Sequence, residues 1–358
     1  MFDLVNIGNV PVGDGHPTVF VAEIGSFFKQ DIDRAMDFLR RTVEAGAPVF
    51  KTEILHDPDV VLKNTGLNCN FNHTGGKRSQ DYRALIEERV VPLKDYERLF
   101  SACEKFNVPA IASVFDFRGV DFLKDVGGAA VKLSRNYINH EPLLRYAAES
   151  GMPVILDIGE IYLSEMMAAV ELVHSVGAPL IINHHPGANP STALQHNLRI
   201  IETYKRVANV PVGLSCHYKG DLMLYVATAL GANMLEKGVV DDPDAAEADI
   251  VSAASFRELK DMIGKVRESW EAIGDGKDRT KAERDISTRA GLVAASDLEI
   301  ETVITSSDIK FAWPPKGISP DHWHLVAGSK LRKPVAAGEA ITWSHFGLEG
   351  ASDEGDAI

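Results

Sequence analysis

The stretch Pro211-Val212-Gly213-Leu214-Ser215-Cys216-His217-Tyr218-Lys219-Gly220 decides the fold. It starts as a short apolar strand after a proline and ends with a hydroxyl, a thiol, an imidazole and an ammonium group. Buried strands usually end in turn residues, so a strand that ends in titratable groups is typical of the mouth of a site. Because adjacent strand residues face opposite sides, Cys216 is predicted to be a buried structural thiol rather than a partner of His217.

Similar apolar runs recur along the chain and make a repeat of eight. The runs are Val19–Gly25, Pro48–Ile54, Pro109–Phe115, Ala129–Ser134, Pro153–Gly159, Pro179–His185, Pro211–His217 and Ala232–Gly238. They are apolar throughout, which is typical of parallel strands covered on both faces. Amphipathic stretches lie between them, at Ile32–Ala45, Tyr96–Phe106, Leu143–Ser150, Leu163–Val176 and Leu198–Ala208.

Eight strand-then-helix units predict an α/β fold, a (β/α)8 TIM barrel. An open doubly wound sheet is the alternative, and the absence of GxGxxG after the first run disfavours it. The barrel is predicted over residues 1–270, a charged linker over 271–288 and a small β-rich domain over 289–358. The insert Asp57–Val91 is predicted to be a polar loop over the barrel mouth. The small domain's core is predicted to contain Trp313, Trp323 and Trp343.

Composition excludes several classes of function. The net charge of −14 argues against nucleic acid as the main partner. No apolar run approaches the ~18 residues that a membrane span needs, and the N-terminus has no export signal. Three scattered cysteines cannot form a disulfide framework, so a cytoplasmic location is expected.

Three of the predicted strands carry a lysine near the end, where a barrel places its site: Lys51, Lys132 and Lys237. One interpretation is salt bridges between neighbouring strands. The other is an anionic ligand, a phosphate or carboxylate, that offsets three converging ammonium groups. A second group, His217 with His184 or His185 and nearby carboxylates, predicts a divalent cation; the alternative is that one histidine only bonds a loop carbonyl.

Several strand-end motifs follow one another in a fixed order: Val21-Ala22-Glu23-Ile24-Gly25, Phe50-Lys51, Ala112-Ser113-Val114-Phe115-Asp116, Val131-Lys132-Leu133-Ser134, Val212-Gly213-Leu214-Ser215-Cys216-His217 and Leu235-Glu236-Lys237. In this order and spacing, the chain resembles the N-acetylneuraminate (sialic acid) synthase family from about Val19 to Ile263. Two later segments, Lys316–Pro320 and Leu331–Glu339, are similar to the antifreeze-like (SAF) domain of that family.

The resemblance implies an enzyme that condenses phosphoenolpyruvate with an acylated amino sugar to a nonulosonic acid and phosphate. It also implies a divalent metal (Mn, or Mg, Co, Fe or Zn) and a homodimer whose SAF domain covers the partner's active site. By position, Lys51 and Lys132 would hold phosphoenolpyruvate, helped by Ser113 and Ser215, while Glu23 would lie near the sugar and His217 would bind the metal. The remaining predicted site residues are Lys237, Asp249, Ser134 and Arg289.

The chain also departs from the family pattern. Gly238 stands where the family has a second metal-ligand histidine, and His185 is predicted to replace that ligand. Asp157 stands in place of a phosphate-binding serine, where a carboxylate repels phosphate; it is predicted to ligate the metal or to mark a changed substrate.

Three functions are therefore open. The first is the synthase just described. The second is the same scaffold acting on another 2-oxo acid or a phosphosugar. The third is a sugar-acid binding protein without catalysis.

Overall fold

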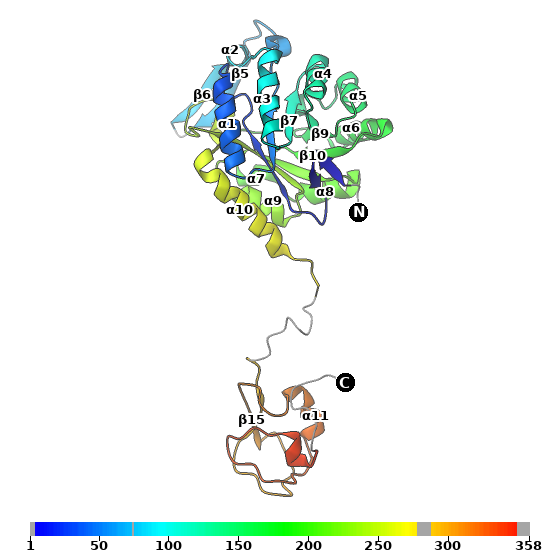
Figure 1. Cartoon of the computed structure of the whole chain (residues 1–358), viewed down its shortest axis with the longest axis vertical. Helices are drawn as coiled ribbons and strands as arrows, with labels where there is room; N and C mark the ends of the chain where they lie inside the picture. Colours follow the sequence, from blue (N-terminus) through cyan, green and yellow to red (C-terminus); the bar gives the residue numbers. More distant parts are fainter. Residues whose placement is uncertain (1–3, 74, 278–287, 349–358) are drawn as a thin grey trace. The chain divides into compact units, whose positions relative to one another are not determined.

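The computed structural model describes residues 4–73, 75–277 and 288–348 (Figure 1). The chain divides into two compact units, Met1–Asp275 and Gly276–Ile358.

The first unit is a closed barrel of eight parallel strands. The sheet order is β11-β10-β9-β8-β7-β4-β3-β12, and pairing between β12 and β11 closes it. The strands are β3 (Val19–Glu23), β4 (Val49–Glu53), β7 (Ala110–Val114), β8 (Ala130–Leu133), β9 (Val154–Ile158), β10 (Leu180–His184), β11 (Val212–Cys216) and β12 (Met234–Val240). All eight predicted strands are present, and the predicted (β/α)8 barrel is confirmed.

Helices cover the outside of the barrel (Figure 1). They are α1 (Ile32–Glu44), α3 (Leu93–Lys105), α4 (Phe117–Asp125), α5 (Glu141–Glu149), α6 (Leu163–Val176), α7 (Ala193–His196), α8 (Ile200–Ala208), α9 (Leu222–Ala229) and α10 (Phe256–Ile273). Helix α1 shows how sequence sets them: the Asp31 side chain caps its first turn, and Phe38 and Leu39 are buried against the sheet. Among the described helices, none combines the length and apolarity needed to cross a bilayer.

An N-terminal hairpin closes one end of the barrel. Strands β1 (Val5–Ile7) and β2 (Val10–Val12) pair antiparallel. Their apolar side chains pack against the inward-facing layer at the start of the barrel strands, which contains Val21, Val49, Ala130, Ile111, Ile155, Ile181 and Met234. The sequence analysis did not predict this hairpin. Its packing closes the strand starts with an apolar plug and leaves the opposite, C-terminal end open.

The insert Asp57–Val91 is more ordered than the predicted polar loop. It contains a short 3₁₀ turn (Pro58–Val60), the hairpin of β5 (Asn68–His73) with β6 (Gly76–Asp81), and helix α2 (Tyr82–Glu87). Its side chains line the cavity at the C-terminal ends of the barrel strands, so the predicted position over the mouth is confirmed.

The linker prediction is wrong at its start, because α10 continues to Ile273. Residues 278–287 of the predicted linker lie outside the described residues. In the second unit, β14 (Gly291–Ala294) pairs antiparallel with β15 (Ile309–Ala312) over a small core that includes Leu292, Ile304 and Ile318. Trp323 and Trp343 pack against this core, but Trp313 is 77% exposed, so that part of the predicted core is wrong.

The apolar plug generates a test of stability. Ile7 is fully buried, and Ile7→Ala is expected to lower the free energy of unfolding by about 2–5 kcal/mol because it leaves a cavity between the hairpin and the barrel. Urea unfolding followed by circular dichroism measures this loss. The control is Asn6→Ala on the same strand, where the side chain is exposed. Equal loss in both variants would contradict the plug.

Candidate active site

Eight polar side chains form a ring inside the barrel. Along a strand, side chains alternate between the two faces, so residues two apart point the same way. Each of these eight residues follows an inward-facing residue of its strand by two positions and therefore also points into the barrel. We call the set the polar ring: Glu23, Lys51, Ser113, Lys132, Asp157, Asn183, Ser215 and Glu236. Seven of these residues are buried, Glu23 being half-buried. Gly213 has to be glycine beside this ring, because a Cβ there would meet the Asn183 amide oxygen at 2.3 Å.

On one side of the polar ring, Lys51 joins two carboxylates. Its ammonium donates to the Glu23 carboxylate and lies 3.4 Å from the Glu236 Oε1. Burial raises the pKa of Glu23 to about 8; Lys51 opposes this rise and the neighbouring charge of Glu236 adds to it. Burial alone would also raise the pKa of Glu236, but Lys132 and Lys51 hold it at about 2. The pKa values of the two carboxyl groups are thus driven apart, Glu23 toward the protonated form and Glu236 toward the ionised form, a division suited to acid and base roles.

On the other side of the ring, Lys132 is surrounded by oxygens of the chain itself. Its Nζ lies 2.7 Å from Glu236 Oε1, 3.1 Å from Asp157 Oδ1 and 3.1 Å from Ser215 Oγ. Ser215 in turn donates to Asp157 Oδ1 at 2.6 Å. An ammonium group has three N–H donors, and three protein oxygens already face them.

The structure thus favours the salt-bridge interpretation for Lys51 and Lys132. Two ammonium groups meet three carboxylates, those of Glu23, Asp157 and Glu236, so these five side chains carry no surplus positive charge. An anion does not have to be present to offset the lysines.

The third lysine does not face the mouth. Lys237 follows Glu236, so alternation turns it outward, and its Nζ donates to the backbone carbonyls of Tyr218 and Gly220 at 2.6 and 3.0 Å. Burial lowers the pKa of this ammonium. The interpretation of three lysines converging on one mouth is therefore wrong, and Lys237 instead ties down the segment that follows His217.

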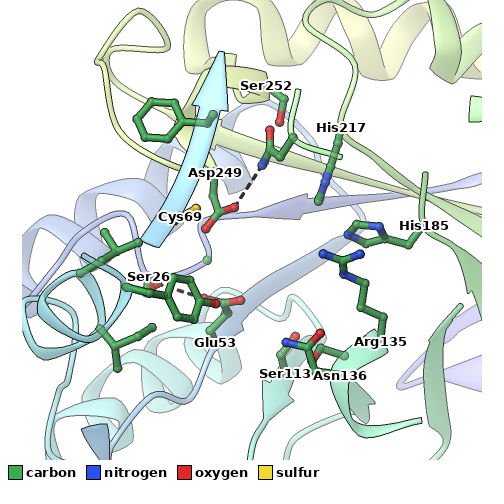
Figure 2. A pocket seen from close by; sticks show the side chains of 18 of the residues that line it. Ser26, Glu53, Cys69, Ser113, Arg135, Asn136, His185, His217, Asp249 and Ser252 are labelled. Atoms are coloured by element: carbon green, nitrogen blue, oxygen red, sulfur yellow. Dashed lines mark hydrogen bonds between the residues drawn. The ribbon is translucent and has the colours of Figure 1, made fainter. Parts of the chain in front are cut away.

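The two histidines predicted to bind metal do lie together. The ring centroids of His185 and His217 are 4.4 Å apart, and both residues line the mouth (Figure 2). His184 faces the helices instead, with its Nε2 2.7 Å from the His196 carbonyl oxygen.

A two-histidine metal site does not fit these rings as they lie. The Gly187 amide donates to His185 Nδ1 at 3.0 Å, so that lone pair is occupied. Burial and then the neighbouring His217 lower the pKa of His185 well below its ordinary value, which leaves a neutral ring with its hydrogen on Nε2. His217 Nδ1 is buried without a hydrogen-bond partner, and no cluster of three or more ligating side chains occurs among the described residues. The metal stays a prediction.

Above the polar ring, the mouth opens into a cavity of about 1070 Å³. Ser113 and Ser134 line it, as does Asp249, which is half-exposed and accepts a hydrogen bond from the Asn189 amide at 3.1 Å (Figure 2). Arg289 belongs to the second unit, two residues before β14. The dimer that would bring it to a partner's mouth stays a prediction.

From the sequence, Glu236 and Lys237 both stand at the end of β12, and Lys237 is the one predicted for the site. Glu236 is central to the polar ring, and counting alternate residues along the strand from Met234 selects it in place of Lys237. Asn183 of the polar ring and Arg135 were not predicted. Arg135, directly after Ser134, points its guanidinium toward His185 (Figure 2). Arg135 begins a short 3₁₀ turn (Arg135–Tyr137), and a single charged residue there carries no periodic signal, so Arg135 could be found only once this turn was placed.

Comparisons with known proteins agree with this architecture. The NeuB family model matches residues 38–278, and the SAF domain model matches residues 289–347. The chain is 26% identical to a pseudaminic acid synthase of Campylobacter jejuni, over 91% of this chain and 96% of that one. It is 22% identical to an N,N'-diacetyllegionaminic acid synthase of Legionella pneumophila, over 95% and 97%.

Among solved structures, a sialic acid synthetase of Leptospira borgpetersenii matches with a TM-score of 0.71 at 25% identity, over 79% of this chain and 94% of that one. The family model covers more than half of the chain, and these relatives are synthases. The chain belongs to the NeuB family, with a SAF domain after its barrel.

Proposed function

We propose that this protein condenses phosphoenolpyruvate with an acylated amino sugar to give a nonulosonic acid and phosphate. The observation that carries the proposal is that Lys51 joins Glu23, whose pKa burial raises, to Glu236, whose pKa the lysines lower, at the open end of a NeuB-family barrel. Relatives named as legionaminic and pseudaminic acid synthases support the class of product.

The chemistry needs one acid and one base. Carbon 3 of the enol attacks the aldehyde carbon of the sugar, and the aldehyde oxygen takes up a proton as the new carbon–carbon bond forms. Glu23 supplies this proton in our scheme. Water then adds to the cationic carbon 2 and gives one proton to Glu236. As the resulting carbon 2 hydroxyl becomes the ketone, its proton goes to the phosphate, which leaves with the bridging oxygen. The two lysines keep the carboxylates in place and divide their protonation states.

The outer part of the cavity suits an acylated amino sugar. The insert hairpin contributes three amide side chains to the lining, Asn68, Asn70 and Asn72, and Asn136 lines the cavity as well. Amides donate and accept hydrogen bonds at once, which matches sugar hydroxyls and N-acyl groups.

A pH dependence follows from Glu23. Because its pKa is raised to about 8, the acid form is present below that pH and is lost above it. Turnover is therefore expected to fall as pH rises through about 8. Glu23→Gln should slow turnover by about 10²–10⁴-fold and remove this alkaline limb.

The matched control for this profile is Glu53→Gln, which changes the carboxylate at the end of the adjacent strand β4. The alkaline limb is expected to persist in that variant. If it also persists in Glu23→Gln, Glu23 is not the acid.

The direct test of the proposed function is phosphate release from phosphoenolpyruvate, with a panel of acylated amino sugars. Sugar-dependent release is expected, and the mixture without sugar is the blank. Parallel reactions with Mn and with chelator test the metal prediction. A folded protein that releases no phosphate with any sugar would contradict the proposal.

A second candidate is a 2-oxo acid donor without phosphate, such as pyruvate. The contacts of Asp157 and Glu236 with Lys132 favour it, because they occupy an ammonium group that a phosphate would need. Consumption of pyruvate with the same sugars, without any response to phosphoenolpyruvate, would identify this alternative.

A further inference from the structure

Arg135 is a cation of the cavity with donors to spare. Its Nη1 donates to the Glu160 carboxylate, and its side chain is 31% exposed. A guanidinium has five N–H donors, and this is the one hydrogen bond that Arg135 makes with its side chain among the described residues. Arg135 therefore keeps several donors for a ligand in the cavity that it lines.

His185 lies beside this guanidinium and offers a further donor. Figure 2 shows the two groups side by side, facing the cavity. Because the Gly187 amide occupies Nδ1 at 3.0 Å, the hydrogen of the neutral ring is on Nε2. A guanidinium fork and an imidazole N–H together suit the oxygens of a phosphate group.

The floor of the same cavity is unsuited to phosphate. Lys132 already faces three protein oxygens, and two of them belong to the carboxylates of Asp157 and Glu236. A phosphate at Lys132 would have to displace one carboxylate and would lie against the other. At short range in a buried site, such repulsion between anions is costly.

We propose that Arg135 and His185 form a phosphate-binding subsite at the rim of the cavity, and that Asp157 keeps phosphate away from Lys132. The phosphate belongs to phosphoenolpyruvate or to a phosphorylated sugar. The inference rests on the proposed function for its choice of ligands, but binding alone can test it.

The experiment is calorimetric titration of the full chain with inorganic phosphate, phosphoenolpyruvate, a hexosamine 6-phosphate, and pyruvate, which lacks phosphate. Arg135→Gln is expected to weaken binding of inorganic phosphate and of at least one of the two phosphorylated ligands by about tenfold or more, because a charge-assisted fork is lost. Pyruvate binding should stay within about twofold, since pyruvate has no phosphate to place there. Which phosphorylated ligand responds identifies the source of the phosphate.

The matched control is Arg78→Gln, an arginine of β6 that lines the same cavity. It removes the same charge elsewhere on the wall and should change phosphate binding by less than about twofold. An equal effect of both variants would show that phosphate responds to the overall charge of the cavity wall and not to a local subsite, and would overturn the proposal.

Asp157→Asn gives an independent measurement, because it keeps the side-chain shape and frees Lys132. Phosphate is expected to bind this variant about tenfold more tightly, and the double variant with Arg135→Gln should regain binding. Unchanged phosphate affinity in Asp157→Asn would overturn the role of Asp157.

The two proposals fail in distinguishable ways. If phosphate binding depends on Arg135 but no sugar-dependent phosphate release occurs, the subsite is supported and the proposed function is contradicted. If sugar-dependent phosphate release occurs and Arg135→Gln leaves it unchanged, the proposed function is supported and the subsite is contradicted.

Discussion

The environment of the Lys132 ammonium constrains the whole site. Three oxygens, from Glu236, Asp157 and Ser215, lie within 3.1 Å of it. Through Glu236 this group connects to Lys51 and Glu23, so five ionisable side chains behave as one buried system. Removal of one member of such a system leaves its partner as an uncompensated buried charge. The protonation of Glu23 and the charge that a ligand can carry both follow from this arrangement.

The barrel makes the polar ring possible because it separates two layers. Below the ring, Ile7 of the hairpin and the apolar strand starts exclude water. Above it, the insert Asp57–Val91 and the segments after the other strands enclose the cavity. Charges that an apolar layer and the cavity walls shield from water interact more strongly than charges on the protein surface. The fold therefore produces a carboxyl with a pKa of about 8 and a carboxylate with a pKa of about 2 side by side.

The sequence predicted the barrel well, because eight apolar strands with helices between them depend on local pattern alone. It also placed Lys51, Lys132 and Asp157 at the mouth. The same alternation selects Glu236 over Lys237, whose ammonium is held by backbone carbonyls outside the mouth. That the three N–H donors of Lys132 all face protein oxygens can be seen only from distances across several strands. Which ring nitrogen of His185 carries the hydrogen depends on one backbone amide, that of Gly187. Neither is encoded in residue spacing.

The most direct test is a crystal structure of the protein with inorganic phosphate bound. We expect the phosphorus atom to lie next to the Arg135 guanidinium, while Lys132 keeps its contacts with Asp157 and Glu236. A phosphorus atom beside the Lys132 ammonium, with Asp157 turned away, would contradict this expectation. That result would mean that the ion pairs of the polar ring separate when phosphate binds and therefore do not keep phosphate away from Lys132.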